Sequence, residues 1–105
     1  MVKMVNEYPV IIESGNHNLR LDISKNKENE FECKITIMHH IKGYWPSKTF
    51  TYTFETEVNL FEEAISLIEE QMHRATIKED YESESELLDI FLELGKIKQT
   101  LKGDK

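Results

Sequence analysis

The hydrophobic residues follow two different spacings along the chain, and the change falls near residue 57. Before it, apolar and polar residues alternate, which is typical of strands with one buried face. After it, apolar residues recur every three or four positions, which is typical of amphipathic helices. The pattern therefore predicts a sheet in the first half of the chain and helices in the second.

Four strands are predicted, at residues 8–13, 19–24, 31–38 and 49–54. Because the connections are short and polar, neighbouring strands are expected to pair antiparallel, as a β-meander over residues 8–56. One face of this sheet would hold the alternating apolar residues Leu19, Leu21, Ile23, Phe31, Cys33, Ile35, Ile37, Phe50, Tyr52 and Phe54.

Two helices are predicted over residues 59–102. Asn59 and Ser83 are each followed three residues later by a glutamate, a spacing that favours them as N-caps. Residues 80–82 contain no Gly or Pro, so one long bent helix is the alternative. A chain of 105 residues has room for one domain. The expected fold is α+β, a four-stranded antiparallel meander followed by two helices packed on one face (ββββαα).

Charge is distributed unevenly. The formal net charge is -7, yet residues 55–93 alone carry thirteen acidic residues against Arg74 and Lys78. One interpretation is a solvated helix face. The other is a surface that docks on a basic protein, or that imitates nucleic-acid phosphates, as an inhibitor of the immunity or phage anti-defence type would. The residues predicted to form this acidic surface are Glu79, Asp80, Glu82, Glu84 and Glu86.

Tyr44 and Trp45 lie in the loop between the third and fourth predicted strands. They would either cap the core or contact a partner, since large aromatic residues anchor interfaces. Together with Arg20 and Lys34 on the outward sheet face, they also suggest a single-stranded nucleic-acid-binding module as the alternative function. So few cations would bind nucleic acid only weakly.

Leu88 and Leu92 flank the apolar stripe of the second predicted helix. They would either pack between the two helices or face a second copy of the chain in a homodimer.

The sequence offers little catalytic chemistry. Cys33 is the single cysteine and alternates with core residues, while His39 and His40 would point to opposite faces of a strand. We therefore expect no metal, no cofactor and no enzymatic activity. No apolar run is long enough to span a membrane and the start lacks the pattern of a signal peptide, so a cytoplasmic location is expected.

Overall fold

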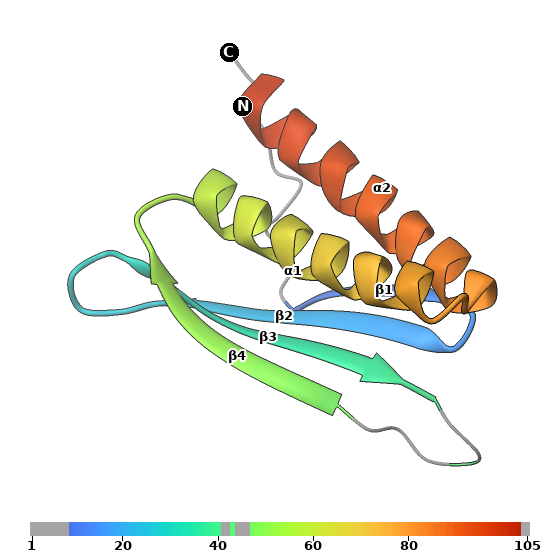
Figure 1. The fold of residues 1–105 in the computed structure, drawn as a ribbon. Helices are drawn as coiled ribbons and strands as arrows, with labels where there is room; N and C mark the ends of the chain where they lie inside the picture. The colour runs from blue at the N-terminus through green and yellow to red at the C-terminus, as the bar shows by residue number, and fades with distance from the viewer. Residues whose placement is uncertain (1–8, 41–42, 44–46, 104–105) are drawn as a thin grey trace.

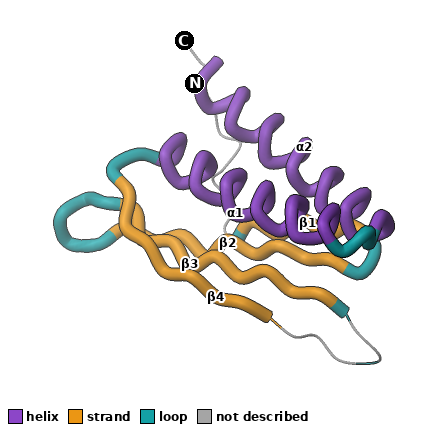
Figure 2. Tube along the Cα trace, viewed as in Figure 1, coloured by secondary structure: helices purple, strands orange, loops and turns teal. Residues whose placement is uncertain are grey.

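The computed structural model describes residues 9–40, 43 and 47–103. It contains one antiparallel sheet with two helices on one of its faces (Figures 1 and 2), which confirms the predicted ββββαα fold. The strands, which are neighbours in chain order, are β1 (Val10–Ser14), β2 (His17–Lys25), β3 (Phe31–His39) and β4 (Ser47–Phe54). The helices are α1 (Glu57–Ile77) and α2 (Tyr81–Gly103).

The register brings the predicted inward residues together on one face. Leu21 of β2 pairs with Ile35 of β3, which in turn pairs with Phe50 of β4. Leu21 and Ile35 are fully buried and Phe50 packs against the same core. Alternation along each strand therefore sorts the side chains as predicted.

The helices complete the core from one side. α1 contacts β3 and β4, whereas α2 contacts β1 and β2. Phe61 and Ile68 of α1 and Ile90 and Leu94 of α2 are fully buried between the layers. Burial of each such side chain stabilises the fold by roughly 1.5–3 kcal/mol. Within the residues that the structure describes, the other face of the sheet carries no helix (Figure 1).

Both predicted helix starts are wrong by one turn. The N-cap of α1 is Thr56, whose side chain accepts a hydrogen bond from the backbone N–H of Asn59 at 3.1 Å. Before α2, Asp80 accepts from the backbone N–H of Ser83 at 3.2 Å and from its hydroxyl at 2.7 Å. Asn59 and Ser83 are therefore not the N-caps. Each lies three positions after the capping residue and donates its backbone N–H to that residue's side chain.

The two helices are separate: α1 ends before α2 begins, and they do not form one long bent helix. The backbone N–H of Glu79 donates to the Thr76 carbonyl and that of Asp80 to the Ala75 carbonyl, which is the Schellman arrangement of a helix end. That arrangement needs a left-handed residue, and Glu79 supplies it with φ 57°. The break therefore occurs without glycine.

Candidate functional site

The turn between α1 and α2 is rich in acidic residues. We call residues 78–84 the hairpin tip; it carries four carboxylates and one lysine. Glu79 and Glu82 are exposed, and within the described part of the chain neither side chain has an ion pair or hydrogen bond. They are therefore the carboxylates of the tip that are available to a partner.

The other predicted acidic residues have structural contacts. Asp80 caps α2, and the hydrogen bonds from Ser83 lower the pKa of its carboxyl group. Glu84 accepts a hydrogen bond from the Thr76 hydroxyl across the turn. The predicted acidic surface thus includes two residues that also hold the hairpin together.

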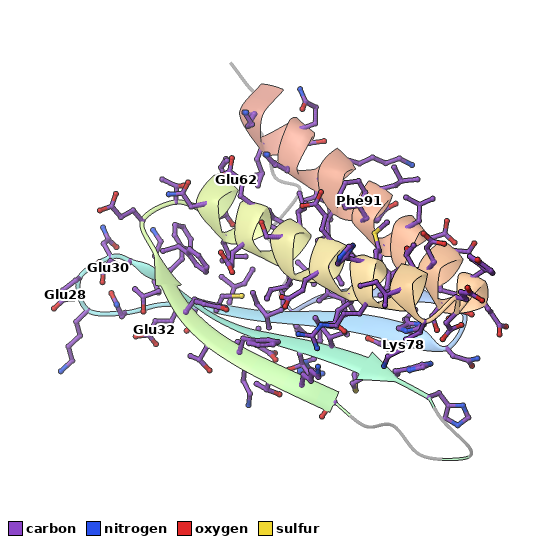
Figure 3. All side chains as sticks on the ribbon, in the orientation of Figure 1. Glu28, Glu30, Glu32, Glu62, Lys78 and Phe91 are labelled. Atoms are coloured by element: carbon purple, nitrogen blue, oxygen red, sulfur yellow. The ribbon has the colours of Figure 1, made fainter. Side chains whose placement is uncertain are left out.

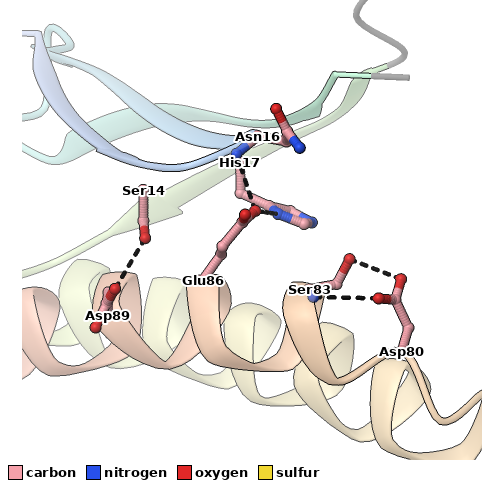
Figure 4. A network of polar contacts seen from close by, with 7 residues as sticks. All are labelled: Ser14, Asn16, His17, Asp80, Ser83, Glu86 and Asp89. Carbon is pink, nitrogen blue, oxygen red and sulfur yellow. Dashed lines mark hydrogen bonds and ion pairs between the residues drawn. The ribbon is translucent and has the colours of Figure 1, made fainter. Parts of the chain in front are cut away.

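Glu86 points away from the surface and joins α2 to the sheet (Figure 4). One carboxylate oxygen, Oε1, lies 2.9 Å from the backbone N of Asn16 and 2.7 Å from Nδ1 of His17. Its side chain is only 14% exposed. Gly15 lies so close that a Cβ added there would overlap the Glu86 carboxylate. The structure therefore places Glu86 in an internal contact rather than on the open acidic surface.

A pair of stacked histidines lies beside this contact. His17 and His39 are partners in the β2–β3 register, and their rings stack with centroids 4.1 Å apart at an angle of 12°. Burial and the adjacent His17 imidazole lower the pKa of His39, an effect that Asp80 and Glu86 partly offset. Sequence reasoning considered His39 with His40 and missed this pair. Continuing the strand pairing from Lys25–Phe31 would have found it.

The histidines line two adjoining pockets of about 250 and 160 Å³. We call them together the histidine pocket. Lys48 and Gln71 border both parts, while Arg74, Lys78 and Asp80 border the smaller one. Ile37 and Leu87 contribute an apolar wall. No group of three side chains suited to hold a metal occurs among residues 9–40, 43 and 47–103.

The middle of α2 carries two exposed apolar side chains. Leu88 and Leu92 are 41% and 52% exposed, so they do not pack between the helices. Leu60 and Leu67 of α1, by contrast, are buried. The interpretation that Leu88 and Leu92 pack between the two helices is therefore wrong, and within the described residues they form an apolar surface without a partner.

The outward sheet face gives little support to nucleic-acid binding. The guanidinium of Arg20 is bound to the Asp22 carboxylate at 3.0 Å, and every Phe and Tyr of the described strands packs toward the core. The aromatic loop residues Tyr44 and Trp45 lie outside the described residues.

Cys33 is fully buried, and burial raises the pKa of its thiol to about 12. A thiol in this environment stays protonated near neutral pH and is a poor nucleophile.

Comparison with protein-family models, with curated proteins and with solved structures finds no match to this chain. Within the described residues, no helix has the length and apolar character needed to cross a membrane.

Proposed function

We propose that this protein acts by binding a basic protein through the hairpin tip and catalyses no reaction. The observation that carries the proposal is the pair of exposed carboxylates, Glu79 and Glu82, on a segment whose only basic residue is Lys78. Such a site attracts a cationic surface over a distance of about 8–10 Å at ordinary salt and loses it as salt rises.

We infer that binding through these negative charges inhibits the partner. Carboxylates that occupy a partner's cationic groove would compete with the phosphates that the groove normally binds. The partner class is therefore a nucleic-acid-binding protein.

The test is capture from a lysate of the source cells on immobilised protein at low salt, with release by salt and identification by mass spectrometry. Glu79→Gln combined with Glu82→Gln should release the captured protein at lower salt. The matched control is Glu28→Gln with Glu32→Gln, which removes the same charge from exposed residues at the opposite end of the sheet (Figure 3).

Equal elution of both double variants would contradict the proposal, since the effect would then follow net charge alone. Displacement of a labelled oligonucleotide from the purified partner would support inhibition. A partner that binds the oligonucleotide and this protein together would contradict it.

A second candidate interface is favoured by the exposed leucines of α2. We propose that Leu88 and Leu92 face a second copy of the chain, with the two α2 helices antiparallel. The first half of α2 is acidic, and Lys96 and Lys102 lie in its second half, whereas Lys98 pairs with Glu62 of α1. Antiparallel pairing therefore places opposite charges across the interface.

Gly95 supports this arrangement. It lies inside α2, three residues after Leu92 and seven after Leu88, and so shares their side of the helix. A Cβ at Gly95 would meet nothing within 4 Å, so nothing in the described fold requires glycine there. Glycine inside a helix costs about 1 kcal/mol relative to alanine, and one benefit it can bring is close approach of another backbone.

The oligomeric state tests this interface. Sedimentation of the wild-type protein should give twice the chain mass of 12.4 kDa, and Leu88→Ser with Leu92→Ser should give 12.4 kDa. Ile77→Ser is the control, because Ile77 is 68% exposed but lies at the end of α1. A wild-type monomer at the highest soluble concentration would contradict the homodimer.

A further inference from the structure

Two of the basic residues of the helical layer lie at the histidine pocket. Arg74 and Lys78 are the only lysine or arginine residues between positions 55 and 93, and both line the smaller part of the pocket. Lys48 reaches the same space from β4, on the other side. Three cations, one from β4 and two from the C-terminal end of α1, therefore border one cavity in a protein of net charge -7.

Two carboxylates lie near the pocket, and both are hydrogen-bonded within the protein, although each keeps its negative charge. Both oxygens of Asp80 accept hydrogen bonds from Ser83, and Oε1 of Glu86 faces His17 and Asn16 (Figure 4). Arg74 shares its charge with Glu70 in an exposed ion pair. Lys48 and Lys78 have no ion pair within the described residues. The two lysines are thus free to bind an anion.

The remaining lining defines the size and character of the ligand. Ile37 and Leu87 form an apolar wall beside the polar end, and Gln71 adds an amide to both parts of the pocket. Volumes of about 250 and 160 Å³ suit a small organic molecule rather than a polymer.

We propose that the histidine pocket binds a small organic phosphate monoester, with its phosphate between Lys48, Arg74 and Lys78 and its organic part against Ile37 and Leu87. Three cations match the double charge of a phosphate monoester better than the single charge of a carboxylate. The guanidinium of Arg74 also suits the geometry of two phosphate oxygens. This site adjoins the hairpin tip, because Lys78 and Asp80 belong to both, but its ligand needs no second protein.

The probes are phenyl phosphate, inorganic phosphate and benzoate. Each is titrated into the full chain while the imidazole signals of His17 and His39 are followed by NMR. Phenyl phosphate should give saturable shifts, inorganic phosphate should bind more weakly because it lacks the ring, and benzoate should bind most weakly. The titrations are run near pH 7.5, where a phosphate monoester, with a second pKa of about 6, is a dianion.

Variants separate the pocket from general charge effects. Lys48→Gln and Lys78→Gln should each raise the dissociation constant about threefold, and about tenfold together, as expected for partly exposed charge pairs. Lys27→Gln with Lys34→Gln, which lie in the β2–β3 turn and on the outward sheet face, should leave it unchanged. Circular dichroism and thermal unfolding establish that each variant is folded.

Three results would overturn the proposal. The first is an absence of saturable shifts with phenyl phosphate up to the order of 10 mM, beyond which binding is negligible. The second is benzoate binding as tightly as phenyl phosphate. The third is equal weakening by the pocket and control variants.

Discussion

Glu79 adopts a left-handed backbone conformation that glutamate does not favour. Its φ of 57° completes the end of α1, where glycine is the usual residue. A residue with a Cβ pays about 1 kcal/mol for the left-handed conformation. The sequence carried no Gly or Pro signal at this break, which explains why a single bent helix could not be dismissed from the pattern alone.

Replacement Glu79→Gly should therefore raise the free energy of unfolding by about 1 kcal/mol, because the strain disappears. Urea denaturation measures this change. Lys78→Gly is the matched control, since Lys78 has φ -83° and gains nothing from glycine. A loss of stability in Glu79→Gly would show that the glutamate side chain contributes more than its backbone costs.

Cys33 is a second residue whose behaviour follows from its surroundings. Because burial raises the pKa of its thiol to about 12, iodoacetamide at pH 8 should leave the native protein unmodified while it alkylates the urea-unfolded chain fully. Intact mass spectrometry distinguishes the two outcomes. Rapid labelling of the native protein would contradict the burial of the Cys33 side chain.

At the scale of elements, the spacing of apolar residues was sufficient to predict the sheet, its inward face and the two helices. Helix starts were missed by one turn because several residues near each start can act as caps. Thr56 and Asn59 at the first start, and Asp80 and Ser83 at the second, all have suitable side chains. Only the backbone geometry selects among them.

Thr56→Ala should destabilise the protein by about 1 kcal/mol through loss of the α1 cap. Asn59→Ala should not destabilise it, since Asn59 lies inside the helix, where alanine is favoured. Thermal or urea unfolding of the two variants measures both effects. The reverse order would mean that α1 begins at the position predicted from sequence.

At the scale of the whole molecule, the histidine pocket arises from contacts between distant segments. The His17–His39 pair follows from the register of β2 and β3, so it could have been predicted from the sequence. The approach of Arg74 and Lys78 to it depends on how α1 and α2 lie across the sheet, which no periodicity encodes. The contact of Glu86 with Asn16 and His17 could not be predicted for the same reason. Seventy residues separate Asn16 from Glu86 along the chain.

This arrangement makes stability depend on pH. The pKa of His39 is lowered in the folded state, so the unfolded chain takes up a proton first as pH falls. Stability should therefore be unaffected above about pH 7.5 and should decline as pH falls through 6.5, the ordinary pKa of histidine. Asp80, whose pKa is also lowered in the folded state, acts in the same sense, but only near and below about pH 4.

Urea denaturation at pH 7.5 and 5.5 measures this dependence, and His39→Asn should reduce it. His73→Asn is the control, because His73 is exposed on α1. An equal pH dependence in wild type and His39→Asn would place the responsible group elsewhere.

The central claim is that the hairpin tip recognises a basic partner, and association kinetics test it most directly. With the captured partner immobilised, Glu79→Gln with Glu82→Gln should lower the association rate constant and flatten its dependence on salt, whereas Glu28→Gln with Glu32→Gln should change neither. Equal association rates for wild type and the tip variant across the salt series would contradict the claim.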